Sequence, residues 1–161
     1  MTGKIRIAVG SDHAGFALKE SVRHYLVSRG YDVEDCGVHS EEPADYPDSA
    51  EKVAVRVSRH EVERGVLICG TGLGVAIAAN KVPGVRAATC NNTLLARFAG
   101  EHNDANILTM GGRIVDEAQA QRILDAWLGA KFAGGRHQER VQKITKIEEE
   151  QVSAGNSLKQ G

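Results

Sequence analysis

The middle of the chain carries the run Val66-Leu67-Ile68-Cys69-Gly70-Thr71-Gly72-Leu73-Gly74. Its first four residues are continuously apolar, a pattern typical of a strand that is buried on both faces. The glycines then interrupt the strand, and the alanine-rich residues 75–81 that follow have the pattern of a helix. A strand, a glycine loop and a helix in this order indicate a parallel α/β sheet.

The same alternation continues on both sides of this run. Further strands are predicted over residues 5–9, 31–36, 85–90 and 106–110, and helical spacing of apolar residues separates them. We therefore predict a single-domain, Rossmann-like α/β/α sandwich with a five-stranded parallel sheet. Residues 1–151 would form this domain, and the small, polar residues 152–161 would form a flexible tail.

Composition excludes several classes of protein. Of the 161 residues, 42% are hydrophobic and 25% charged, and the formal net charge is −1, so no polyanion partner such as a nucleic acid is expected. No apolar run is long enough to cross a membrane, and no signal peptide precedes the first strand, so we expect a cytoplasmic protein. The three cysteines and six histidines lack the spacings of disulfide, zinc or haem motifs, so neither a metal nor another cofactor is expected.

The glycine loop suggests an anion site. Backbone N–H groups converge where such a loop opens a helix, and the helix dipole adds to their attraction for negative charge. The third glycine comes one residue too early for a dinucleotide fingerprint, and the lysine ending of a P-loop is missing. The alternative is a tight strand-to-helix turn with no ligand.

Cys69 stands at the carboxyl end of the predicted strand, directly before this loop. Neighbouring N–H groups and a helix N-terminus stabilise a thiolate. A thiolate base beside N–H donors is what proton abstraction next to a carbonyl requires. The alternative is a buried cysteine that acts as a small hydrophobic residue, as we expect for Cys90.

Other polar residues also follow predicted strands or lie in conspicuous motifs. Asp12-His13 and His102-Asn103 supply groups that exchange protons near neutral pH, although each histidine could be structural. Arg136 and Arg140 lie on one helical face and, with Arg113, could clamp a phosphate, although surface arginines are usually only solvated.

A last helix is indicated by the stripe Val141, Ile144 and Ile147. Its other positions are mostly charged, so it has little of its own to bury against. It could pack on a partner subunit or close over its own sheet.

Five motifs together resemble one family, the ribose-5-phosphate isomerase B type of sugar-phosphate isomerase. They occur in the family's order and cover the chain to about Gln151. The motifs are Gly10-Ser11-Asp12-His13-Ala14-Gly15-Phe16, Cys69-Gly70-Thr71-Gly72, Ala78-Ala79-Asn80-Lys81, Glu101-His102-Asn103-Asp104-Ala105-Asn106 and Gly134-Gly135-Arg136-His137-Gln138.

The resemblance implies a metal-free aldose–ketose isomerase that interconverts D-ribose 5-phosphate and D-ribulose 5-phosphate through a cis-enediol. Cys69 resembles the family's base, and His102 resembles the acid/base that opens the furanose ring. The loop Gly70-Thr71-Gly72-Leu73-Gly74 resembles its oxyanion loop, with Thr71 assisting. A branch with a glutamate base carries it at the position of Val75, so this chain resembles the cysteine branch.

The remaining candidate residues resemble the family's substrate contacts. Asp12 and His13 would contact the substrate, with Asn103 close by, and Arg113, Arg136 and Arg140 would bind its phosphate. The resemblance also implies a homodimer, or a tetramer, in which each site is shared between two subunits, and a place in the pentose phosphate pathway or the catabolism of a rarer sugar.

Three alternatives stay open at this point. The same chemistry could act on allose 6-phosphate, galactose 6-phosphate or erythrulose 4-phosphate. A non-catalytic phosphate-binding module would need the loop and the arginines but not Cys69 or His102. A thiol redox protein would need a second cysteine near Cys69, and none is close in sequence.

Overall fold

The computed structural model describes residues 3–161 and contains one parallel sheet of five strands. The strands lie in the order β2-β1-β3-β5-β4, and every neighbouring pair is parallel. Their bounds are Arg6–Ser11 (β1), Asp32–Asp35 (β2), Arg64–Cys69 (β3), Ala87–Thr89 (β4) and Ile107–Gly111 (β5). The predicted five-stranded parallel sheet is confirmed.

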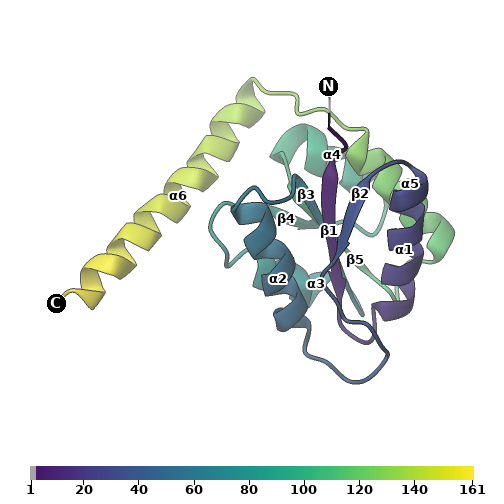
Figure 1. Ribbon diagram of the computed structural model, residues 1–161. Helices are drawn as coiled ribbons and strands as arrows, with labels where there is room; N and C mark the ends of the chain where they lie inside the picture. Colours follow the sequence, from purple (N-terminus) through teal and green to yellow (C-terminus); the bar gives the residue numbers. More distant parts are fainter. Residues whose placement is uncertain (1–2) are drawn as a thin grey trace.

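Helices cover both faces of the sheet and complete a three-layer α/β/α sandwich (Figure 1). Helices α1, α4 and α5 pack on one face, and α2 and α3 pack on the other. The helices are Phe16–Ser28 (α1), Tyr46–Ser58 (α2), Leu73–Ala79 (α3), Thr93–Asn103 (α4), Glu117–Leu128 (α5) and Arg136–Lys159 (α6).

The two cores follow from the alternation of side chains along the strands. In β1, Ile7 and Val9 face the α1/α4/α5 core, and Ala8 between them faces the α2/α3 core. The first core also holds Leu124 and Trp127 of α5, which are 0% and 3% exposed. Truncating a fully buried leucine such as Leu124 to alanine would cost about 2–5 kcal/mol.

All five strands point the same way, so the sheet has a carboxyl edge and an amino edge. The carboxyl edge contains the ends of the strands and the loops that follow them, and the amino edge contains their beginnings. Helix α4 leaves β4 at the carboxyl edge and returns to the start of β5, so its last turn lies at the amino edge.

The outer side of β4 would present unpaired backbone groups, and one side chain covers part of it. The Asn80 amide accepts a hydrogen bond from Ala87 N (2.8 Å) and donates one to Ala87 O (2.9 Å). Asn80 therefore occupies the hydrogen-bonding positions that a sixth strand would use at this residue.

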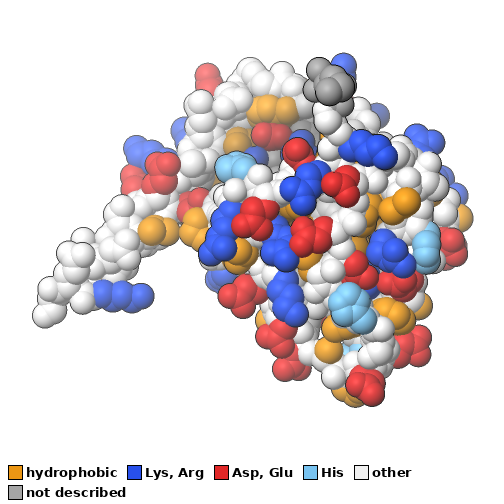
Figure 2. Space-filling model, viewed as in Figure 1, with side chains coloured by type: hydrophobic (Ala, Val, Ile, Leu, Met, Phe, Trp, Pro, Cys, Tyr) orange, Lys and Arg blue, Asp and Glu red, His pale blue; other side chains and the backbone are white. Residues whose placement is uncertain are grey.

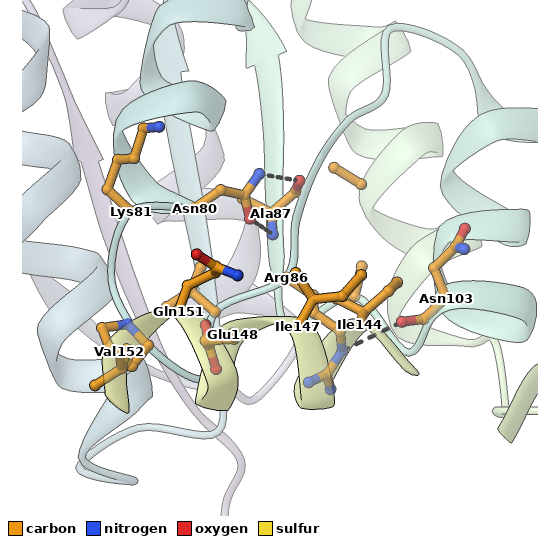
Figure 3. A pocket seen from close by; sticks show the side chains of 14 residues that line it. Asn80, Lys81, Arg86, Ala87, Asn103, Ile144, Ile147, Glu148, Gln151 and Val152 are labelled. Atoms are coloured by element: carbon orange, nitrogen blue, oxygen red, sulfur yellow. Dashed lines mark hydrogen bonds between the residues drawn. The ribbon is translucent and has the colours of Figure 1, made fainter. Parts of the chain in front are cut away.

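Helix α6 stands apart from the sandwich (Figure 1), joined to it by residues 129–135. Val141 is buried, but Ile144 and Ile147 are 48% and 61% exposed. The α6 side chains instead form one wall of a cavity of about 700 Å³ against β4 and its preceding loop (Figure 3). The helix thus covers its own sheet only loosely, which leaves an apolar stripe exposed.

The same helix continues through residues 152–159, where the sequence suggested a flexible tail. Small polar residues alone do not end a helix, and α6 continues through Gly155 and Asn156 in a segment that has no proline. Its residues are all exposed, as expected for a segment outside the core. Their mobility, and the domain boundary at 151, stay predictions.

Charges of both signs are mixed over the face shown in Figure 2, without a large patch of one sign. Across residues 3–161, none of the helices combines the length and apolar character needed to cross a membrane.

Candidate active site

Cys69 ends β3 at the carboxyl edge, and the glycine loop folds back over it. Its side chain is 5% exposed, and the N–H of Gly72 donates a hydrogen bond to its Sγ atom over 3.2 Å. This N–H stabilises negative charge on the sulfur, because a backbone dipole points at it.

The loop holds this shape because close packing and hydrogen bonds both restrict Gly72. Its φ of +84° is a conformation that favours glycine, and a Cβ atom here would lie 2.8 Å from the carbonyl carbon of Met110. Its carbonyl oxygen accepts hydrogen bonds from the Oγ1 atoms of Thr109 (2.7 Å) and Thr89 (3.1 Å). Side chains of β4 and β5 therefore hold the glycine whose N–H faces Cys69.

Arg113 brings a positive charge to the same loop. The turn after β5 is tied to β3, because Gly112 N donates to Cys69 O (2.8 Å) and Arg113 N donates to Gly70 O (3.0 Å). The Arg113 guanidinium lies against Gly70, where a Cβ atom would come within 3.2 Å of Nη1. Glycine at position 70 thus leaves room for the guanidinium against the loop.

Asp12 and His13 follow β1 and reach the same edge. The buried Asp12 accepts a hydrogen bond from Gly15 N (3.0 Å), which fixes its carboxylate at the start of α1. His13 is exposed, and its Nδ1 atom lies 3.1 Å from both the O and the N of Ala44. The loop before α2 therefore orients the imidazole and leaves Nε2 available to a ligand.

Behind this edge lies a partly buried ion-pair network centred on Lys19. Lys19 is fully buried, and its Nζ donates to both Asp35 oxygens (2.7 and 2.8 Å) and to Glu20 (3.1 Å). Asp35 also accepts from Gly37 N (2.9 Å), and Gly37 O accepts from Ser11 N (2.8 Å). The network therefore supports the strand end that carries Asp12.

Tyr46 was not predicted from the sequence. Its ring packs on Gly74, where a Cβ atom would come within 2.6 Å of the ring, and 41% of the residue stays exposed. Tyr46 thus forms a wall beside the glycine loop. Its only sequence signal is its place at the start of a helix that follows a polar loop.

A second group of candidate residues lies at the amino edge. His102, in the last turn of α4, is stacked between Phe98 (centroids 4.6 Å apart) and His137 of α6 (4.2 Å). The linker before α6 is fastened there, since Ala133 N donates to Glu101 O over 2.9 Å. Asn103 ends the same helix, and Arg136 and Arg140 stand on the first turns of α6.

His137 is the second residue that the sequence did not single out. Burial lowers the pKa of His137, and its proximity to His102, Arg136 and Arg140 lowers it further. A neutral His137 can stack on His102 without charge repulsion. Only the fold could reveal this pair, because the two histidines lie on separate helices.

The structure thus divides the candidate residues into two groups. Asp12, His13, the segment Cys69–Gly74 and Arg113 meet at the carboxyl edge, whereas His102, Asn103, Arg136 and Arg140 gather at the amino edge. The six residues of β3 separate the two edges by roughly 20 Å. One chain alone therefore does not assemble the single site that the motifs suggested.

Comparisons with known proteins identify the family of this chain. The family model described as "Ribose/Galactose Isomerase" matches residues 7–144. The chain belongs to this isomerase family. Ribose-5-phosphate isomerase B of Escherichia coli is 50% identical over 144 residues, covering 89% of this chain and 97% of the relative.

Solved structures show the same fold as this isomerase. Ribose-5-phosphate isomerase B of Clostridium thermocellum has a TM-score of 0.89 at 53% identity, covering 91% of this chain and 99% of the other. The Mycoplasma genitalium enzyme, solved with bound ribulose-5-phosphate, has a TM-score of 0.89 at 40% identity, covering 92% and 99%.

The other two thiols of the isomerase differ from Cys69 in their surroundings. Burial in the apolar core raises the pKa of Cys90 to about 11. Burial also raises the pKa of Cys36, which lies outside both groups of candidate residues. Both thiols therefore stay protonated at neutral pH, as expected for structural cysteines.

Proposed function

We propose that this isomerase interconverts D-ribose 5-phosphate and D-ribulose 5-phosphate through a cis-enediol. The observation that carries the proposal is the Cys69 thiol at the end of β3, facing the N–H of Gly72, with the Arg113 guanidinium against the same glycine loop at Gly70. The family and the names of the relatives, one of them solved with ribulose-5-phosphate, support the choice of substrate.

In the forward direction, the Cys69 thiolate removes the proton from C2 of the open-chain aldose. The electron pair moves toward O1, and O1 takes up a proton to give the cis-enediol. O2 then loses its proton as the C2 carbonyl forms, and C1 receives the proton that Cys69 carried. Cys69 ends the cycle as the thiolate, so the reaction needs no net proton.

The glycine loop would stabilise the charge that develops on O1 and O2. Backbone N–H groups are effective here because they are oriented before the substrate arrives. The Thr71 hydroxyl, which accepts from Leu73 N (3.2 Å), would help to move the proton between the two oxygens. Asp12 would hold sugar hydroxyl groups beside the loop.

Ring opening precedes this step, and we assign it to His102. Opening a furanose requires a proton for the ring oxygen and the loss of a proton from O1, and a histidine near neutral pH can do both. Asn103 would hold the sugar beside it. Arg113, Arg136 and Arg140, with His13, would bind the phosphate, because guanidinium groups match phosphate oxygens in charge and geometry.

We further propose a homodimer in which His102, Asn103, Arg136 and Arg140 of one subunit complete the site around Cys69 of the other. The roughly 20 Å between the two edges supports this arrangement, since one substrate cannot reach both within a chain. A two-fold axis would make both sites equivalent. The cavity between α6 and β4, which α6 covers only loosely, offers surface for the contact between the subunits. The cytoplasmic location and the pentose phosphate pathway stay predictions.

The test is interconversion of ribose 5-phosphate and ribulose 5-phosphate in the presence of EDTA. We expect fast turnover by the wild type and a loss of about 10³-fold or more in Cys69→Ala, since a general base contributes up to about 10⁴-fold. Cys90→Ala, which removes the other buried thiol of the core, is the matched control and should stay active.

Full activity of Cys69→Ala would assign the base to another group. A wild type that is silent on both pentose phosphates would disprove the substrate and direct the search to four- and six-carbon sugar phosphates.

A further inference from the structure

Arg86 is a charged residue at the amino edge to which the proposed chemistry gives no role. It directly precedes β4, and its side chain is 25% exposed. Its Nε and Nη2 atoms donate to Asp104 O (3.0 and 2.8 Å), Nη2 also donates to Asp104 Oδ2 (3.3 Å), and Nε lies 3.3 Å from Asn103 O (Figure 3 shows the contact with Asn103). One guanidinium therefore binds the two residues that end α4.

The backbone at this point needs such support. Asp104 adopts φ 47° and ψ 44°, a left-handed conformation that is unusual for a residue other than glycine. Such conformations persist where surrounding contacts hold them, and they occur often at functional sites. The left-handed turn ends α4 directly after Asn103.

The surrounding loop is fastened to the same residue. Arg86 N donates to Asn106 Oδ1 (2.8 Å), and Arg86 O accepts from Asn106 N (3.1 Å). Asn106 Nδ2 in turn donates to Gly84 O (2.8 Å). Main chain and side chain of Arg86 thus hold both sides of the turn that follows His102 and Asn103.

His102 depends on this turn for its position. The rings of Phe98 and His137 lie within 14° and 6° of parallel to its imidazole, so they fix the plane of the ring. Stacked rings can still slide over one another, because dispersion contacts have little directional preference within the plane. The backbone of the last turn of α4 therefore determines where the two ring nitrogens lie.

We propose that Arg86 is a positioning residue, which clamps the last turn of α4 so that His102 and Asn103 reach the partner subunit's Cys69 site in the correct place. The inference rests on the proposed role of His102 in ring opening. Arginine suits this task because its planar fork bonds two carbonyl oxygens and a carboxylate at once, which a lysine ammonium on a flexible stem cannot reproduce. Its positive charge also matches the negative end of the helix dipole.

A double-mutant cycle tests the proposal by kinetics. Arg86→Lys should lower kcat for ribose 5-phosphate by about tenfold or more, because small misplacements of a catalytic group have large effects. In a His102→Asn background the same substitution should have a much smaller effect on kcat, because one of the two groups that it displaces is already gone and only Asn103 remains. Equal losses in both backgrounds would overturn the proposal, since a general structural defect acts in either.

Arg6→Lys is the matched control. Arg6 also stands at the amino edge, donates to a backbone carbonyl (Glu61 O, 2.8 Å) and pairs with an aspartate (Asp32, 3.4 Å), but it does not contact α4. It should keep wild-type kcat. Asp104→Gly should also stay near wild type, because glycine adopts the left-handed backbone without strain and its carbonyl still accepts from Arg86.

A second measurement does not depend on turnover. In NMR spectra, the ring protons of His102 should be shifted by the currents of the Phe98 and His137 rings, and Arg86→Lys should move these signals while Arg6→Lys leaves them in place. Unchanged signals in Arg86→Lys would overturn the proposal. If His102→Asn kept full activity while the signals moved, the ring-opening assignment would fail but the clamp would stand.

Discussion

The two edges of the sheet hold their functional groups in different ways. At the carboxyl edge the groups are fastened to strand ends: Cys69 terminates β3, and the N–H that faces it belongs to a glycine locked by Thr89 and Thr109. At the amino edge they are side chains on two helices, held by the stack around His102 and by the clamp from Arg86.

This difference matches the demands of the two proposed steps. Stabilising an enediolate needs dipoles that are rigid before the reaction, which a sheet supplies. Opening a ring and binding a phosphate need long side chains that reach across a subunit boundary. Neither edge is a complete site by itself, so the proposed active site forms only where two subunits meet.

The strongest test of this division is complementation between two variants of strongly reduced activity. Cys69→Ala breaks only the carboxyl edge, and His102→Asn breaks only the amino edge. In a mixed dimer one site carries both defects and the other carries none. Unfolding and refolding an equal mixture should therefore restore about one quarter of wild-type activity by random pairing.

Each variant refolded alone is the control and should keep only its low residual activity. If the mixture also kept only this low activity while mixed dimers were present, the two groups would not share a site across subunits.

A substitution at one glycine tests whether the rigid geometry of the carboxyl edge matters for turnover. Gly72→Ala should lower kcat by about 100-fold or more, because the Cβ atom would displace the N–H that faces Cys69. Gly30→Ala is the matched control, since Gly30 also has a positive φ (+92°) but has open space around it.

Gly30→Ala should cost about 1 kcal/mol of stability and leave kcat unchanged. Thermal unfolding of both variants measures the cost of backbone strain, and their kcat values measure the effect of displacing the Gly72 N–H. Equal kcat values for the two variants would show that the position of the N–H does not limit the reaction.

The smallest effect concerns the ion pairs behind the carboxyl edge. The hydrogen bond from Arg23, opposed by burial and reinforced by Lys19, lowers the pKa of Glu20 from 4.5 to about 2. A carboxyl whose pKa is lowered in the folded state adds stability above its unfolded pKa and loses it as the pH falls. This contribution should thus disappear between about pH 4.5 and pH 2.

Glu20→Gln should accordingly be less stable than the wild type by about 1 kcal/mol at pH 6, and the gap should close toward pH 2. Urea unfolding at several pH values measures it. Glu41→Gln, which changes an exposed loop glutamate, should show no such gap. A gap that stayed constant with pH would mean that Glu20 contributes through packing and not through its charge.

The sequence predicted the sheet well because the signals that define a parallel strand are local. The continuous apolar run before Cys69 and the glycines after it are read directly along the chain. The grouping of Asp12, Cys69 and Arg113 also follows, because the ends of parallel strands meet at one edge.

The separation of His102 from Cys69 was harder to see. It requires knowing that α4 runs back to the amino edge, a fact of topology and not of residue pattern. Tyr46 and His137 were missed for a related reason. Each acts through a ring contact between distant segments, and no spacing rule encodes such a contact. The helical end of α6 was missed because the small, polar residues there, with Gly155 and Asn156 among them, are typical of a chain that has left a helix, whereas α6 continues through them.

The two hydrogen bonds between the Asn80 amide and the Ala87 backbone have a consequence for assembly. Exposed edge strands tend to recruit further strands, which leads to open-ended aggregates. With the amide of Asn80 already on the backbone of β4, an incoming strand would first have to displace it. Association on this side must then proceed through side chains, which can define a closed dimer, and not through growth of the sheet, which has no natural end.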